Sequence, residues 1–218
     1  MANPDHFQRV LQGVEAWNRF RRTRPQVQPD LREVDLSGFD LTGIDLSHAD
    51  LTGANLAEAY LIRANLTKAV LVAANLTEAD LIEANLIEAV ARQALFVRAD
   101  LSNAGLIRAD LTACDLSGAN LARAALPWAI LSHSTLAHTD LTLADFREAV
   151  LVHANLSEAN LLDASLTGAD FRGTSLIGAR NLRIELLRKV RTLAYAQLDP
   201  SLRNQIERDA PELLNDPT

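Results

Sequence analysis

Residues 54–76 read ANLAE AYLIR ANLTK AVLVA ANL, with a leucine at every fifth position. The same spacing holds without a slip from Leu36 to Leu176, over 29 positions that carry 25 Leu, three Phe and one Ala. Two residues before each of these positions lies a second register, which is Ala in 22 of the 29 cases. A fixed internal period of this kind is the signature of a repeat architecture.

A period of five suits neither regular element alone. In an α-helix five residues advance about 500°, which scatters successive leucines over all faces. In a flat strand five is odd, so successive leucines would alternate between the two sides. All of them point inward only if the chain bends after each short extended step. The sequence therefore predicts an all-β solenoid of stacked coils.

The unit A-(D/N)-L-x-x, as in residues 54–58 and 159–163, resembles the pentapeptide-repeat family. The resemblance covers residues 31–180 and is closest in character to cyanobacterial-type members without an assigned activity. It implies a right-handed quadrilateral β-helix with four pentads, and hence 20 residues, per coil. The 29 units would then make about seven coils and a rod of roughly 35 Å.

The end coils of a solenoid expose unpaired backbone groups, so helical caps are expected at both ends. We divide the chain into an N-terminal capping helix and linker (1–29), the β-helix (30–180) and a C-terminal helical cap or tail (181–218). Asn3-Pro4 predicts the start of one N-terminal helix. Its apolar face would consist of Phe7, Val10, Leu11, Val14, Trp17 and Phe20. Its late arginines complement the helix dipole, which favours a cap over a nucleic-acid-binding arm.

The C-terminal segment shows helical periodicity from Leu182 to Ala194. Asp199-Pro200 predicts a second, shorter helix that extends to about Ala210. The last residues, 215–218, are expected to be frayed.

The formal net charge of −7 is uneven along the chain. Residues 31–180 carry ten bases against nineteen acids, which argues against direct nucleic-acid binding. One cysteine excludes an internal disulfide framework. The residues from Met1 onward lack a signal-peptide layout, and no apolar run approaches 18 residues. The cytoplasm is therefore the default location, without membrane insertion.

The acidic, histidine and cysteine side chains that could take part in catalysis or metal binding are better explained by structural roles. Asp80 and Asp100, like the other residues before each core leucine, are interpreted as turn-capping groups rather than catalytic carboxylates. His133 and His153 should be neighbours on successive coils, and a solvated or partner-facing pair is favoured over a metal site because zinc requires four ligands. Cys114 occupies a small inward slot and is expected to be buried. The sequence predicts no catalytic, cofactor-binding or metal site.

Ala91 is the one small residue in the large core register. A cavity there would cost about 3 kcal/mol without compensation. Leu95 and Phe96 are expected to supply the missing volume, and a local bulge at residues 91–93 is the alternative.

The outward positions form one apolar stripe when they are sorted at 20 residues per coil. We name the valine-rich face by its six members, Val70, Val72, Val90, Ile130, Val150 and Val152. Asp110 and Thr112 interrupt it. A neighbouring ladder of outward residues consists of Lys68, Glu88, Arg108, Trp128 and Glu148. In this ladder opposite charges are expected to pair on successive coils, and Trp128 is expected to be exposed beside Arg108. The stripe indicates an interface, although β-branched residues also simply suit strands.

These observations predict a non-enzymatic, rod-shaped scaffold or regulator that binds another protein, whose identity stays open. The predicted surface is the valine-rich face with Trp128, His133 and His153. A homodimer through this face or through the C-terminal helices is a further expectation. The alternative comes from a branch of the family whose acidic, DNA-like dimers bind type II topoisomerases and protect gyrase from quinolones. This chain departs from that branch in its leucine core and mild acidity.

Overall fold

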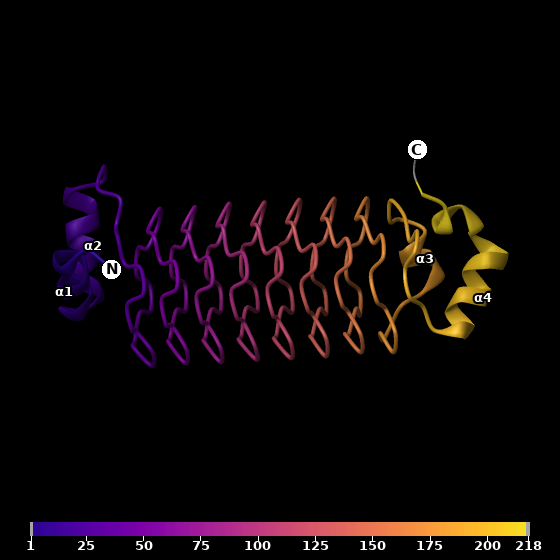
Figure 1. Ribbon diagram of the computed structural model, residues 1–218, viewed down its shortest axis with the longest axis horizontal. Helices are drawn as coiled ribbons and strands as arrows, with labels where there is room; N and C mark the ends of the chain where they lie inside the picture. Colours follow the sequence, from indigo (N-terminus) through magenta and orange to yellow (C-terminus); the bar gives the residue numbers. More distant parts are fainter. Residues whose placement is uncertain (1, 217–218) are drawn as a thin grey trace.

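The computed structural model describes residues 2–216 and forms a straight rod with helices at both ends (Figure 1). Parallel backbone bridges join each extended residue to the residue 20 positions later, from Asp30↔Asp50 to Asn160↔Arg180. Each coil therefore contains 20 residues and four pentads, and the rod is a four-sided β-helix. Along the described chain each pentad contributes a single bridging residue, because a turn follows at once.

Each corner is a β-turn of one kind. At residues 51–54 the Ala54 amide donates to the Leu51 carbonyl at 2.9 Å, and Gly53 between them has a φ of +65°. A positive φ at the third residue defines a type II turn. The same left-handed conformation recurs in non-glycine residues such as Glu58 and Trp128, at φ +59° and +58°.

Backbone hydrogen bonds between coils repeat with every pentad. The Leu56 amide donates to the Asn75 carbonyl at 2.7 Å, and the Glu58 amide donates to the Thr77 carbonyl at 2.9 Å. In the opposite direction the Asn75 amide donates to the Ala54 carbonyl at 2.9 Å. The turn residue is therefore held in its costly conformation by a bond to the next coil, and the coils cannot shift in register without losing these bonds.

The two sequence registers fill the interior. The leucines and the alanines two residues before them are almost fully buried. Asp and Asn before each leucine bond the turn backbone: the Asp100 Oδ1 accepts from the Ser102 amide at 2.9 Å, and the Asp80 Oδ1 accepts from the Ile82 amide at 3.1 Å. These two residues also bridge each other across adjacent coils. The turn-capping interpretation is confirmed.

Not every residue of the two registers is buried: Phe39, two residues before the core residue Leu41, is 39% exposed. The prediction that Leu95 supplies the volume missing at Ala91 is wrong. Leu95 is 43% exposed on the outside and adds no volume beside Ala91, whereas Phe96 is fully buried. The coil is continuous at Ala91, whose amide donates to the Asp110 carbonyl at 2.8 Å, so there is no bulge.

The N-terminal segment forms two helices where one was predicted. They are α1 (Pro4–Leu11), capped by the Asn3 side chain, and α2 (Val14–Thr23). Gly13, at φ +98°, ends the first helix and turns the chain. Leu11 is consequently exposed, while Trp17 is fully buried against the first coil.

Polar groups of α1 and α2 occupy the positions that a preceding coil would fill. The Asp45 amide donates to Asn18 Oδ1 at 2.8 Å, and Trp17 Nε1 donates to the Asp45 carbonyl at 2.7 Å. On another side the Asp30 amide donates to His6 Nδ1 at 3.0 Å. The helices thus complete the backbone hydrogen bonding of two sides of the first coil.

The long helix predicted over residues 182–194 is also wrong. Only α3 (Ile184–Leu187) is helical, and the chain then returns to the β-helix, with bridges from Asp170 to Thr192 and from Ser175 to Gln197. Leu193 and Leu198 occupy the buried core positions of this extra coil. The spacing of 22 residues, instead of 20, accommodates α3.

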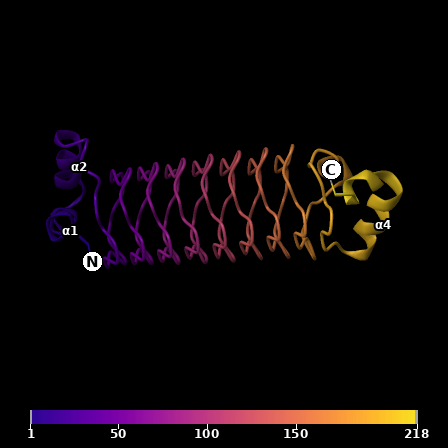
Figure 2. The ribbon, with the colours of Figure 1, turned by 45° about the horizontal axis from the view of Figure 1, so that its top comes forward.

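The helix predicted after Asp199 is confirmed as α4 (Pro200–Asp209), and η1 (Pro211–Leu214) follows it. Both lie at the end of the rod (Figure 2). The Leu193 amide donates to the Leu213 carbonyl at 2.6 Å, as it would to a next coil. Asn215, expected to be frayed, accepts from Thr192 Oγ1 at 2.9 Å, and residues 217–218 lie outside the described part. No helix within residues 2–216 combines the length and apolarity that a membrane crossing requires.

Candidate interaction surface

The valine-rich face is a stack of bridged residues on one side of the rod. Val70 bridges Val90, and Ile130 bridges Val150, so these side chains lie one above the other on successive coils. Ile130 is 40% exposed, and the five valines of the face are half-buried. The bridged valines stack directly on one another, so the face presents an aliphatic ridge in two stretches, Val70 with Val90 and Ile130 with Val150.

Asp110 divides this ridge and is itself buried. Its Oδ1 accepts from the Thr112 amide and hydroxyl, at 3.1 and 2.6 Å, and its Oδ2 accepts from Arg92 Nε at 2.5 Å. Burial acts to raise the pKa of Asp110, but the bonds from Thr112 and Arg92 outweigh it and hold the pKa below its ordinary value. The ridge is therefore interrupted by the buried Asp110 carboxylate, whose charge is neutralised by Arg92.

A ladder of charged and aromatic side chains lines one margin of the face. Lys68 Nζ lies 3.4 Å from a Glu88 carboxylate oxygen. The Arg108 guanidinium lies over the Trp128 ring, 5.6 Å from its centroid. Trp128 is 53% exposed, beside Ile130 in the same coil. The predicted pairing is confirmed for Lys68 with Glu88 and for Arg108 with Trp128, whereas Glu148 pairs with Arg191 outside the ladder. Trp128 and Ile130 are the exposed large apolar side chains of the ladder and the face.

The predicted histidine pair lies on the other margin. The His133 and His153 rings stack with centroids 5.3 Å apart and an interplanar angle of 24°. A Cβ at Gly173, one coil further, would lie 2.3 Å from His153 Nδ1, so the glycine leaves room for this ring. Within residues 2–216 no group of three or more His, Cys, Asp or Glu is arranged to hold a metal ion. His133 and His153 thus form a stacked pair of exposed rings along this margin of the face.

Cys114 is buried, as expected, next to the Ala91 position. Its thiol donates to the Ala91 carbonyl with an Sγ–O distance of 2.7 Å. Burial raises the pKa of the Cys114 thiol to about 12, which keeps it in the unreactive protonated form.

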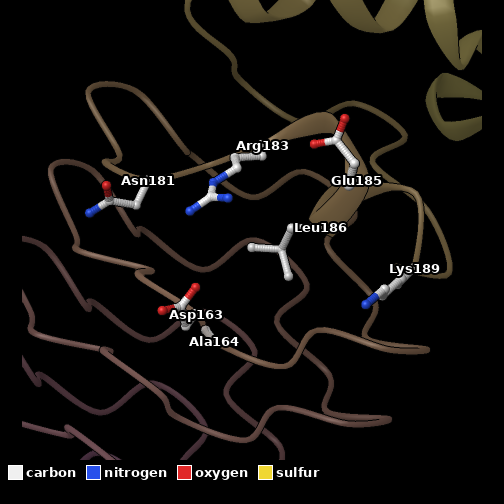
Figure 3. Close-up of a pocket in the computed structure, with 7 residues that line it drawn as sticks. All are labelled: Asp163, Ala164, Asn181, Arg183, Glu185, Leu186 and Lys189. Carbon is white, nitrogen blue, oxygen red and sulfur yellow. The ribbon is translucent and has the colours of Figure 1, made fainter.

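Sequence reasoning missed a pocket of about 410 Å³ that opens where α3 leaves the β-helix (Figure 3). Asp163 from the last regular coils faces Arg183, and Glu185, Leu186 and Lys189 close the other side. The two acids and two bases are all exposed. The five-residue period ends after Leu176. This break could have indicated an irregular segment, but the residues that follow it were interpreted as a long helix.

Solved structures resemble this chain to different degrees, and only the first of the three that follow has a TM-score above 0.5. QnrB1, a plasmid-mediated fluoroquinolone resistance protein, is 21% identical over 80% of this chain and 84% of its own, with a TM-score of 0.53. HetL, involved in the regulation of heterocyst differentiation in the cyanobacterium Nostoc sp. strain PCC 7120, is 27% identical over 83% and 93%, with a TM-score of 0.32. The protein alr5209 from Nostoc PCC 7120 is 35% identical over 50% and 84%, with a TM-score of 0.41. No curated protein matches the chain in sequence.

The repeat itself gives the identity. Pentapeptide repeats match as eight copies over residues 30–67, 74–112, 109–147 and 144–180. These segments cover most of the chain and coincide with the bridged coils. The chain therefore belongs to the pentapeptide-repeat family, whose members form right-handed quadrilateral β-helices.

Proposed function

We propose that this protein is a non-enzymatic scaffold that binds another protein through the valine-rich face and Trp128. The observation that carries the proposal is the exposed pair Trp128 and Ile130 on the ridge. Indole rings are the side chains most enriched at binding hot spots. Trp128 and Ile130 adjoin each other and the half-buried valines of the face, and such a contiguous apolar patch, unlike a single exposed apolar side chain, favours a docking role.

The scaffold role follows from the way in which the coils are joined. Every pentad makes hydrogen bonds in both directions along the rod. Such a lattice holds surface side chains at fixed spacings and loses little conformational entropy when a partner binds. A rigid ridge of this kind suits recognition by complementary shape.

Affinity capture from native lysate tests the proposal when the bait variants are matched. Wild-type bait is compared with a Trp128→Ala, Ile130→Asp double variant and with an Ile62→Asp, Ile82→Asp control on the opposite side of the rod. A partner retained by wild type and by the control, but lost from the face variant, is the expected result. Identical protein sets on all three baits would contradict it.

The topoisomerase alternative receives less support from the surface. A DNA-like side requires unpaired acids, yet Arg63 lies 2.7 Å from a Glu83 carboxylate oxygen, and Arg98 pairs with Glu78. The likeness to QnrB1, a fluoroquinolone resistance protein, concerns the fold. A gyrase supercoiling assay with and without ciprofloxacin decides: inhibition or protection by this protein would favour the alternative, and no effect at excess protein would exclude it.

We also propose that the helices at both ends act as caps. The support is the bonding of Asn18, Trp17 and His6 to the first coil and of Leu213 to the last. Backbone groups satisfied in this way are not available for end-to-end stacking of rods.

A further inference from the structure

The central column of the valine-rich face consists of nine bridged residues, from Asp30 to Thr192. The inner seven are nearly symmetric about Asp110, in the order Asp50, Val70, Val90, Asp110, Ile130, Val150 and Asp170. Within these seven an aspartate stands at each end and in the centre, and two β-branched aliphatic residues lie on either side of the centre. A surface with this symmetry can pair with itself when one copy is reversed.

A dimer with twofold symmetry requires that the same patch meets itself. If two rods pack face to face in opposite directions, with the axis at Asp110, Val70 lies opposite Val150 of the second copy. Val90 then lies opposite Ile130 of the second copy. Every aliphatic residue of the column thus meets an aliphatic residue.

The flanking positions favour the antiparallel arrangement over the parallel one. Beside the column, Val72 meets Val152 of the second copy, and on the other margin Lys68 meets Glu148. In a parallel dimer Val72 would instead lie against Lys68, and Val152 against Glu148. Antiparallel packing therefore joins apolar to apolar and cation to anion at the same positions.

Like charges approach at the axis, where Asp110 meets its own copy, and at both ends of the column, where Asp50 meets Asp170 of the second copy. At the ends Arg32 Nε lies 3.6 Å from an Asp50 carboxylate oxygen, and an Arg172 guanidinium nitrogen lies 2.7 Å from an Asp170 carboxylate oxygen.

At the axis Asp110 has an arginine of its own as well. Arg92 neutralises each of the two Asp110 carboxylates within its own chain, at 2.5 Å. At the margin Arg108 also faces its own copy, but its guanidinium lies over Trp128. These contacts, at the axis and at the ends, weaken the dimer and do not forbid it.

The available area places this interface among the small interfaces of transient complexes. Six coil spacings of about 4.8 Å, along a side of about five residues at roughly 3.3 Å each, give about 480 Å² per chain. The total of roughly 1,000 Å² lies at the lower limit of specific interfaces. A reversible dimer in the micromolar range is the consistent expectation.

We propose that a second copy of this chain covers the valine-rich face, antiparallel and centred on Asp110. The proposal rests on the proposed function, since both treat this face as a protein interface, and it names the partner. The scaffold then presents two symmetrical ends, related by the twofold axis.

Cysteine cross-linking tests the register directly. Val70→Cys and Val150→Cys chains are prepared separately, and the buried native Cys114 stays unreactive. Mixing the two variants should give a cross-linked dimer under mild oxidation or with a short bismaleimide, whereas each variant alone should give little. Ile82→Cys with Thr142→Cys, on the opposite side, is the matched control pair.

Sedimentation equilibrium supplies the second measurement. The Val70→Asp, Val150→Asp variant should raise the dimer dissociation constant at least tenfold, and the Ile62→Asp, Ile82→Asp control should leave it unchanged. Circular dichroism checks that both variants are folded. Three results would overturn the proposal. They are a wild-type protein that stays monomeric at several hundred micromolar, cross-linking within either single variant alone, and cross-linking of the control pair equal to that of the Val70→Cys and Val150→Cys mixture.

The two proposals fail in different ways. If the wild type is monomeric but the Val70→Asp, Val150→Asp bait loses a captured partner, the second copy is wrong and the protein-binding face stands. If capture is the same with that bait, the proposed function falls as well.

Discussion

At the scale of single residues, the fold places one residue of each pentad in a left-handed conformation, and in most pentads this residue is not glycine. That conformation costs an L-residue roughly 1–2 kcal/mol relative to the right-handed region. Gly38 occupies such a position at φ +68°, and a Cβ there would meet nothing within 4 Å. Ala113 occupies the same position at φ +58°.

Substitutions at Gly38 and Ala113 measure the free-energy cost of the left-handed backbone conformation. Gly38→Ala should destabilise the protein by about 1 kcal/mol. Ala113→Gly should be neutral or stabilise it by up to about 1 kcal/mol, since relief of strain is partly offset by unfolded-state entropy. Gly105→Ala is the control: its φ is not left-handed and its added Cβ would make ordinary contacts at 3.8 Å. Thermal unfolding measures all three, and a stabilising Gly38→Ala would contradict the argument.

The Asp110–Arg92 pair predicts a pH dependence. Because the folded pKa of Asp110 lies below its ordinary value of 3.8, its charged form stabilises the fold above that value, and this contribution is lost as the pH falls through the folded pKa. Asp110→Asn should therefore lower the melting temperature at pH 7, and the difference from wild type should shrink below pH 4. Asp163→Asn, on the exposed rim of the α3 pocket, serves as control. A difference that stays constant from pH 7 to pH 3 would refute the prediction.

At the scale of elements, α2 stabilises the rod by completing the first coil. Asn18 Nδ2 donates to the Gly43 carbonyl at 2.9 Å, and Asn18 Oδ1 accepts from the Asp45 amide. Asn18→Ala removes both bonds, at about 1 kcal/mol each, so a loss of about 2 kcal/mol is expected. Hydrogen exchange at the Asp45 amide should accelerate in the variant.

Arg19→Ala on the same helix is the matched control. Arg19 pairs with Glu15 at 3.1 Å, but both side chains are largely exposed, so less than about 0.5 kcal/mol is expected. If the two variants lose equal stability, α2 does not act through the hydrogen bonds of Asn18.

The same elements show how far the sequence could predict the structure. Helix α4 was predictable because Asp199-Pro200 marks its start. The extra coil was not, because Leu193 lies 17 positions after Leu176, which is not a multiple of five, and the intervening leucines also fit helical spacing. Ala196-Gln197-Leu198 does repeat the A-x-L motif, so part of the signal was present. The exact packing of α3, and the pocket beside it, depend on tertiary contacts.

At the scale of the whole molecule, the five-residue period predicted the core, while the position of the surface needed the 20-residue coil. Pentads are nearly equivalent inside, since leucine and alanine recur in all four sides. Outside they differ, and only stacking at 20 residues brings Val70, Val90, Ile130 and Val150 onto one side. Core and surface can therefore be separated experimentally by deletions that keep the five-residue period.

Deletion of residues 96–105 removes two pentads and joins Leu95 to Leu106, so the core pattern continues. The C-terminal half of the rod then turns by half a coil, which places Ile130 and Val150 on the side opposite Val70 and Val90. Deletion of residues 96–115 removes one full coil and joins Leu95 to Leu116, which keeps all four on one side and removes Asp110.

We expect both deletion variants to fold, because each retains complete pentads and both helical ends. Only the 10-residue deletion should abolish the dimer in sedimentation equilibrium. The 20-residue deletion should retain the dimer. It reduces the contact area, but it also removes the repulsion between the two central aspartates, which should restore part of the lost free energy of dimerisation. Dimers of equal strength in both variants would show that the valine-rich face does not hold the copies together, because splitting that face between two sides of the rod would have had no effect.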